Sequence, residues 1–485
     1  MIFPWPWRVA GLLSISLLGA RTEDRTIEKA PIDSLIATLP AGLARSPEPA
    51  RDADNGWIEF LKALNDFKST GPKIAALREM DAANWNTDDV SLLDGVFARD
   101  KGTFERVRRA ADKKALAVVG TAGGGRYAKL AEAYDDPKKL DELTKRETAQ
   151  ALVLILNGKR DEGVRQLAGG ATMYLRLAAS GGPARFYEAH QSALRLFLRR
   201  MRQAAKLPVV RGDDLAALLQ ALPETAKRDT DYRKVVIDDL FEHGLPALAE
   251  TETVGQVLQC VDGEEPAKGP DPNDAIVLAF TQPKAPVDKI ATAKLMGEGA
   301  LEILKAIDLP WVADASFPHA VPDAEAAGAY PADVLTIEAS ERHIKDDDKS
   351  GFVSRLAALA NPLGRLMSPA YLDDLVEGRK ASLATLATVA LTRACLAVHI
   401  YRRKHHDLPD TLELLVKDGI LKAIPIDPFD DNPVHYSKER GILWSVGPDG
   451  KDDDGDSSFQ HPAQEGGPPG APKDIVVTLN PSPAP

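Results

Sequence analysis

Cysteine is almost absent from this chain of 485 residues, which holds only Cys260 and Cys395. Two cysteines so far apart exclude the disulfide framework of a small secreted domain. Cys395 also lies inside an apolar run with helical spacing, where a free thiol behaves as a small buried hydrophobe. The pattern therefore favours two buried free thiols over one long-range bridge.

Positive charge is also in deficit. The 60 Lys and Arg residues face 72 Asp and Glu residues, which gives a net charge of −12. An acidic chain repels the phosphate backbone, so we expect no nucleic-acid partner. The hydrophobic content of 44% is enough for packed cores, and the length indicates roughly two to four domains.

Motifs of the common catalytic centres are missing. The chain has no H-E-x-x-H, no G-x-S-x-G and no G-x-x-x-x-G-K-[ST] sequence. The glycine-rich run 120–125 lacks the Lys-Ser/Thr pair that holds a phosphate, which favours a loop or helix break. The charged stretch 341–348 fits a solvated face better than the lining of a cleft. We therefore lean towards a protein that is not an enzyme.

Long apolar runs are confined to the N-terminus. Arg8 precedes a 12-residue apolar run, Val9 to Ala20, that ends in small residues. This length fits a signal peptide and is short for a membrane span. Leu18 is large for the −3 position of a cleavage site after Ala20, so an uncleaved anchor stays open. We expect residues 1–20 to be a signal peptide or N-terminal anchor. The protein would then be extracytoplasmic, in the periplasm or cell envelope, with membrane contact only if the segment is retained.

The body of the chain has the spacing of helices. Residues 21–55 indicate a flexible lead, and residues 56–260 a helical domain. Gly169-Gly170 is among the sites interpreted as breaks between helices. Residues 261–345 indicate a small α+β element with loops, because they hold two β-rich runs at 275–280 and 334–337.

The C-terminal part, residues 346–485, is expected to form a separate module. The apolar and polar stripes predict one long helix over 371–403. Residues 404–479 predict a roll, in which two strands at 434–437 and 441–446 pair and a terminal strand covers 474–479.

Between the last two strands lies a loop crowded with aspartates. Five of them fall within eight residues: Asp449, Asp452, Asp453, Asp454 and Asp456. Calcium prefers six to eight oxygen ligands of this kind. The EF-hand register fails, because Gly450 stands where the first Asp must be. A calcium site and a solvated acidic turn both remain open from the loop alone.

The order of these signals resembles the globular end of the type II secretion system protein G family, the major pseudopilins. The resemblance is carried by about 60 residues: Leu408-Pro409 with Leu412 and Leu415, then Ile424-Pro425-x-Asp427-Pro428-Phe429, then Ser445-Val446-Gly447-Pro448-Asp449-Gly450.

The resemblance implies an α/β roll, in which one long helix packs on a small antiparallel sheet. It also implies a calcium site in the final loop, held by Asp449, Asp452, Asp453, Asp454 or Asp456. The pseudopilin leader sequence is missing, and about 370 other residues precede the helix. We therefore expect no polymerisation into a pseudopilus. The whole chain resembles large exported proteins of planctomycete-like bacteria.

Together these patterns predict a mainly α-helical body, α+β overall, with a C-terminal pseudopilin-like roll. The first functional hypothesis is a non-enzymatic exported protein, with a helical scaffold or binding body and a calcium-stabilised interaction module for a protein partner. The second is an extracytoplasmic hydrolase with a cleft between the helical body and the 261–345 element. The third is an accessory component of a type II secretion or pilus-like machine.

Overall fold

The computed structural model of the protein describes residues 29–44, 54–67, 85, 87–118, 137–224, 230–250, 287–307, 309, 311, 361–458 and 473–479. Most of these residues are helical, and three short strands form one antiparallel sheet. The expected α+β class is therefore confirmed. The N-terminal segment 1–20, most of the lead 21–55, and the β-rich runs at 275–280 and 334–337 lie outside the described residues.

The chain divides into two compact units, and two of the five boundaries between them fall inside helices. The first unit consists of Met1–Ser46, Val236–Asp308 and Ala315–Glu377. The second unit consists of Pro47–Val235, Leu309–Asp314 and Gly378–Pro485.

The first unit contains helices only, among its described residues. They are α1 (Ile32–Ile36), the end of α10 (Thr230–Asp239), the π-helical turn η5 (Leu240–Gly244), α11 (Leu245–Glu250), α14 (Lys289–Ile307) and the beginning of α18 (Pro362–His405). At Gly244 the backbone comes close to two side chains, since an added Cβ would lie 2.8 Å from Met296 and 3.0 Å from Tyr371. Any larger residue at this position would have to displace the side chains of Met296 and Tyr371.

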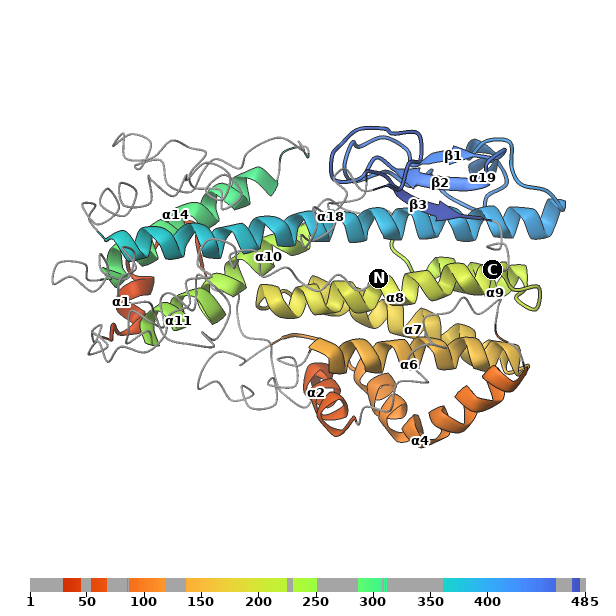
Figure 1. Ribbon diagram of the computed structural model, residues 1–485, viewed down its shortest axis with the longest axis horizontal. Coiled ribbons are helices and arrows are strands. Elements are labelled where there is room, and N and C mark those ends of the chain that lie inside the picture. The colour runs from red at the N-terminus through yellow and green to blue at the C-terminus, as the bar shows by residue number, and fades with distance from the viewer. Residues whose placement is uncertain are drawn as a thin grey trace, which may run out of the picture. The chain divides into compact units, whose positions relative to one another are not determined.

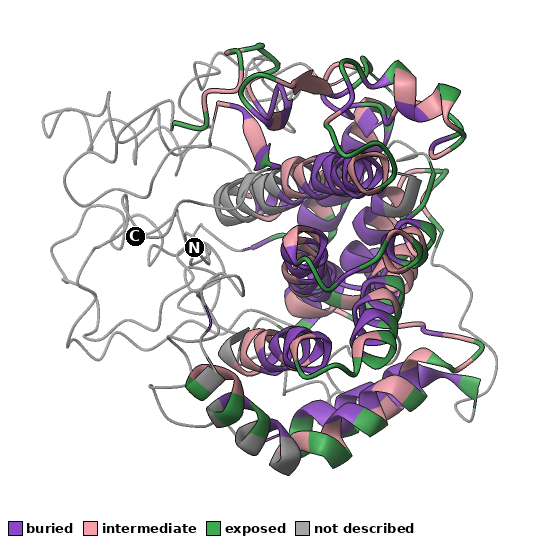
Figure 2. Ribbon diagram, turned by 90° about the vertical axis from the view of Figure 1, so that its right-hand side faces the viewer, coloured by how far each residue is buried: buried purple, intermediate pink, exposed green. Residues whose placement is uncertain are grey.

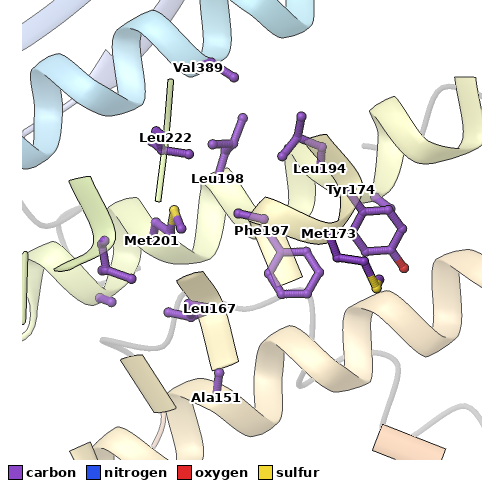
Figure 3. Packing of buried hydrophobic residues seen from close by; sticks show 14 of the residues in the cluster. Ala151, Leu167, Met173, Tyr174, Leu194, Phe197, Leu198, Met201, Leu222 and Val389 are labelled. Carbon is purple, nitrogen blue, oxygen red and sulfur yellow. The ribbon is translucent and has the colours of Figure 1, made fainter. Parts of the chain in front are cut away.

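The second unit is built on stacked helices. They are α2 (Gly56–Asp66), α4 (Thr87–Ala111), α6 (Pro137–Leu156), α7 (Arg160–Ala179), α8 (Ala184–Lys206), α9 (Gly212–Gln220), the part of α18 from Gly378 onward, and the short α19 (Glu413–Lys417). Their apolar residues recur at three- and four-residue steps and form one continuous core. Figure 3 shows part of it, where Phe197 and Met201 of α8 lie between residues of α7 and Val389 of α18. On α4, at the lower edge of Figure 2, exposed residues lie on the outer side.

One expected break is wrong. Gly169 and Gly170 lie in the middle of α7, which runs without interruption from Arg160 to Ala179. Gly170 is required because an added Cβ would lie 2.1 Å from the ring of Phe197. The glycine pair thus marks a close approach between helices α7 and α8, and the helix continues through it at a modest cost in propensity.

Helix α18 is longer than expected, since it covers Pro362–His405 instead of 371–403. Its C-terminal part runs beside α8, and the two helices are joined by hydroxyl groups. Arg195 donates to Thr385 over 2.8 Å, and Arg202 donates to Thr392 over 2.6 Å. In each pair the donor and the acceptor are 190 residues apart in sequence. The spacing is the same at both points, so the two helices run parallel with a fixed register.

The end of α8 is held by a single arginine of α18. The guanidinium of Arg403 donates to the carbonyl oxygens of Leu207, Val210 and Ala205, over 2.8, 3.1 and 3.3 Å. One of these acceptors, the carbonyl of Ala205, belongs to the last turn of α8, where a helix leaves its carbonyl groups without partners.

The sheet lies along the C-terminal part of α18, as Figure 1 shows. Its strands are β1 (His435–Ser437), β2 (Ile442–Ser445) and β3 (Ile475–Thr478), paired antiparallel in the order β1-β2-β3. Leu443 and Val477 from the sheet share one core with Ala394 and Val398 of α18. The strands expected at 434–437, 441–446 and 474–479 are therefore confirmed to within a residue or two.

The segment Gly378–His405 is the one helical stretch of the described residues that is long and apolar enough to cross a membrane. However, 83% of its most apolar window is buried inside the protein. A core helix passes the same test of length and composition. Cys395, on this stretch, is a buried free thiol as expected.

Candidate functional site

The turn Pro425-x-Asp427-Pro428-Phe429 is organised by one buried carboxylate. Asp427 is fully buried, and its Oδ1 accepts a hydrogen bond from the amide of Phe429 over 3.1 Å. Its Oδ2 accepts from the amide of Val446 over 2.9 Å, at the end of β2. Burial raises the pKa of Asp427, although these amides and the hydroxyl of Ser445 favour its charged form. The side chain thus ties the turn to the sheet.

Three aspartates of the loop accept hydrogen bonds from backbone amides of the loop itself. Asp449, Asp452 and Asp456 each accept a hydrogen bond from the amide two residues later, over 3.1, 3.0 and 2.9 Å. This is the geometry of Asx turns, in which a short side chain stabilises a local bend.

Cationic and aromatic side chains also contact three of these carboxylates. Asp454 pairs with Arg440 over 2.9 Å, and Asp456 pairs with Lys473 over 3.2 Å. Asp452 accepts from the indole of Trp444 over 2.9 Å and lies 3.4 Å from Nδ1 of His435. The loop is thereby fixed to the outer side of the sheet.

A buried carboxylate outside the expected set holds the centre of the loop. Asp474, just before β3, is 1% exposed and accepts from the amides of Gly455 over 2.7 Å and Asp453 over 3.4 Å. Burial raises the pKa of Asp474 against the effect of these two amides. The backbone here presents N–H groups to a carboxylate, whereas a calcium loop presents carbonyl oxygens to a cation.

Four of the five aspartates expected to bind calcium, Asp449, Asp452, Asp454 and Asp456, therefore have separate hydrogen-bond or ion-pair partners. Among the described residues, no three Asp, Glu, His or Cys side chains are grouped as metal ligands. The residues present fit a calcium ion poorly in this arrangement, since Arg440 and Lys473 already supply positive charge to two of them. Calcium binding stays a prediction from the sequence.

A second candidate site is a cavity in the helical body. It has a volume of about 390 Å³ and is lined by residues from α4, α6 and α7 and the residue after α4. Its apolar wall consists of Val107, Ala111, Met173 and two glycines. The polar part of the lining is Arg108, Asp112, Glu147, Glu162, Arg165 and Gln166. The volume lies within the range of small-molecule sites in proteins.

Two polar side chains of this lining are deeply buried. Glu147 is 2% exposed and Gln166 is 3% exposed. The amide nitrogen of Gln166 donates to the backbone oxygen of Glu147 over 2.7 Å and to Gln150 over 3.0 Å. In contrast, Oε2 of Glu147 and Oε1 of Gln166 have no hydrogen-bond partner within the described part of the chain.

The ionisation of Glu147 is strongly perturbed. Burial raises its pKa from 4.5 to about 7, although the positive charge of Arg108 favours the carboxylate. Burial also raises the pKa of the neighbouring Tyr174, and the negative charge of Glu147 adds to this increase. A buried carboxyl that titrates near neutral pH beside a cavity is a common mark of a functional site.

Sequence reasoning did not single out Glu147, although a signal was present. The residue lies on a stripe with Leu140, Thr144, Ala151 and Leu154, at three- and four-residue steps along α6. An acidic residue that interrupts a buried stripe requires either a partner or a raised pKa.

The buried histidines are core residues. His190 is fully buried and lies with its ring 5.6 Å from that of Trp57. Burial lowers its pKa to about 3. His399 of α18 is 2% exposed, and burial together with the charges of Arg403, Arg402 and Lys206 also lowers its pKa to about 3. Both rings are therefore neutral at ordinary pH.

The cleft expected beside the 261–345 element depends on residues that lie largely outside the described ones. Comparisons with protein-family models, with curated proteins and with solved structures find no match to this chain.

Proposed function

We propose that this protein is a non-enzymatic exported protein, in which a helical scaffold carries a pseudopilin-like interaction module for a protein partner. We define the module as Gly378–His405 of α18, α19 and the three-stranded sheet with its loops. The observation that carries the proposal is the packing of one long helix on an antiparallel sheet, with the Asp427 turn tied to β2. This is the arrangement that the resemblance to pseudopilins implies.

The contacts of the acidic loop support the proposal, because its carboxylates stabilise the conformation of the loop. Asp452, Asp454 and Asp456 are held by backbone amides and by cationic or aromatic side chains. Such contacts fix the loop in one conformation, which reduces the entropy lost when a surface binds a partner. The module therefore has the properties of a preorganised binding surface.

The interaction can be tested by site-specific photo-crosslinking in cells that make the full chain. Glu439 and Lys451 are exposed positions on the module, and Lys101 is an exposed position on α4. We expect a crosslinker at Glu439 or Lys451 to capture one protein species that a crosslinker at Lys101 does not capture. Absence of an adduct from both module positions, or the same adducts from all three, would contradict the proposal.

Export depends on the apolar run Val9 to Ala20 and can be tested separately. We expect the full chain in the periplasmic or envelope fraction, and the variant Leu13→Arg in the cytoplasm, because a charge in the apolar run disfavours insertion. A wild-type chain that stays in the cytoplasm would exclude this part of the proposal.

A further inference from the structure

Strand β3 lies at one edge of the three-stranded sheet, because the strand order is β1-β2-β3 (Figure 1). The amide of Leu479, just after β3, donates to the carbonyl of Gly441 over 2.8 Å. These two residues lie opposite each other when the register of β2 and β3 is continued by one residue. In an antiparallel pair every second residue bonds to the neighbouring strand. The N–H and C=O groups of Val476 and Thr478 therefore point away from β2.

The beginning of this edge is closed by the chain itself. The amide of Asp474 donates outward to the carbonyl of Asp456 over 3.0 Å. Further along the strand, Val476 and Thr478 make no outward backbone hydrogen bond to any residue that the structure describes. Thr478 is exposed and Val476 is partly exposed. The open part of the edge therefore lies at the surface.

The opposite edge of the sheet, at the start of β1, is covered. The amide of Val434 donates to the carbonyl of Pro425 over 3.0 Å, and Ile426 forms a bridge with Pro433. The turn that contains Asp427 thus occupies the edge beside β1. In contrast, the four residues of β3, Ile-Val-Val-Thr, include no charge and no proline, which are common protections of an edge strand.

Positive charge surrounds the end of the β3 edge. Nζ of Lys206, the last residue of α8, donates to Oγ1 of Thr478 over 3.2 Å. Arg402 and Arg403 lie in the same region, since their charges and that of Lys206 all lower the pKa of His399. A chain that pairs with β3 places side chains near Lys206. A carboxylate on that chain is therefore favoured, and a basic side chain is disfavoured.

We infer that the open edge of β3 binds an extended acidic segment of the protein partner, which adds to the sheet as a further strand. Its backbone exchanges hydrogen bonds with Val476 and Thr478, and one of its carboxylates pairs with Lys206. In this mode of recognition the main-chain bonds supply affinity and the side chains supply selectivity. The inference rests on the proposed interaction module and identifies the part of it that the partner contacts.

The probe for this edge is the acetylated peptide amide Glu-Val-Thr-Val-Glu-Val, labelled with a fluorophore, which is acidic and has high strand propensity. Fluorescence anisotropy with the full chain measures its affinity, and we expect saturable binding. Replacement of both Glu residues of the peptide by Lys should weaken binding about tenfold or more, because the new charges repel Lys206.

Two N-methylated forms of the peptide test strand addition itself. One form is methylated at the odd positions and the other at the even positions. Only alternate N–H groups of an added strand face the edge. We therefore expect one form to lose about tenfold or more in affinity, and the other form to keep the affinity of the parent peptide.

Substitutions at Thr478 test the location. Thr478→Pro removes the outward N–H and leaves the bonds between β2 and β3, which come from the neighbouring residues, so we expect peptide binding to be lost. Thr478→Val keeps this N–H and the branched side chain, and we expect binding close to that of the wild type. Urea unfolding followed by circular dichroism checks that both variants are folded. Lys206→Gln should reduce the preference for the Glu peptide over the Lys peptide.

Crosslinking in cells separates this inference from the proposed function. With the crosslinker at Glu439, we expect the wild-type adduct to persist in Thr478→Val and to disappear in Thr478→Pro. An adduct that persists in Thr478→Pro would leave the interaction module in place and overturn strand addition at β3. Absence of an adduct from the wild type would instead contradict the module.

Three further outcomes would overturn the inference. The parent peptide does not bind the wild-type chain, or the two N-methylated forms bind equally, so that no alternate pattern of N–H groups is recognised. The full chain forms a dimer that Thr478→Pro dissociates, which would show that a second copy of β3 occupies the edge.

Discussion

The side-chain Oδ2 of Asp427 accepts a 2.9 Å hydrogen bond from the backbone amide of Val446, while its Oδ1 accepts from Phe429. One buried carboxylate thus joins the proline-rich turn to the residue that directly follows β2. Loss of this group leaves two amides without an acceptor inside the protein.

We expect Asp427→Ala to reduce the free energy of unfolding of the protein by about 2 to 5 kcal/mol, because two buried N–H groups lose their acceptor. Asp427→Asn keeps one acceptor and should have a smaller effect. Urea unfolding followed by circular dichroism measures both changes. Equal losses for the two variants would show that the hydrogen bonds are not the cause.

Neighbouring glycines in α7 should respond in opposite directions. Gly170→Ala places a methyl group 2.1 Å from the ring of Phe197, and we expect a loss of about 1 to 3 kcal/mol from overpacking. Gly169→Ala meets no atom within 4 Å, and we expect a gain of about 0.5 to 1 kcal/mol from helix propensity. The melting temperatures of the two variants, compared with that of the wild type, measure these effects. Changes of the same sign in both variants would contradict the packing described for α7 and α8.

The stability of the helical body should depend on the ionisation of Glu147. Its pKa is raised from 4.5 to about 7 on folding, so the stabilising contribution of the neutral form is complete below pH 4.5 and is lost as the pH rises through 7. The charged groups that line the cavity around it are Arg108 on α4, Asp112 just after α4, and Glu162 and Arg165 on α7.

Glu147→Gln removes this dependence. The shift corresponds to about 3 kcal/mol, so we expect the variant to be more stable than the wild type by up to this amount at pH 8 and similar to it at pH 4.5. Urea unfolding at the two pH values measures the difference, with Glu105→Gln as the exposed control. A difference between wild type and variant that is independent of pH would exclude a raised pKa at this position.

The acidic loop gives a prediction about calcium. Because Asp454 and Asp456 are already paired with Arg440 and Lys473, we expect the same melting temperature in excess calcium and in excess chelator. A calcium-dependent rise would show that the loop rearranges to form the site predicted from the sequence. The variant Arg440→Gln removes one competing cation and is the form in which such a rise should be largest.

The sequence predicted the strands and turns of the C-terminal region well, because their signals are local. Proline at 409, 425 and 428 and the Asx turns of the aspartates fix backbone bends within a few residues. The strands of the sheet were predicted to within a residue or two for the same reason.

Interactions over long distances in the sequence were not predictable in this way. Gly170 resembles a helix break until the ring of Phe197 is placed against it. Asp474 lies outside the expected acidic set, yet it accepts the amides at the centre of the loop. Glu147 becomes a candidate only when α4 and α7 form a cavity beside it. In each case the partner comes from another element.

The pairing of Arg195 with Thr385, and of Arg202 with Thr392, has a consequence for synthesis of the protein. During translation α8 leaves the ribosome about 190 residues before the helix that covers it, which at about 5 to 20 residues per second is a delay of roughly 10 to 40 seconds. Throughout this interval the side of α8 that packs against α18, with Arg195 and Arg202, lacks its native partner. The C-terminal module therefore completes folding of the helical body, and a nascent chain that stops before residue 378 exposes a surface for chaperones or aggregation.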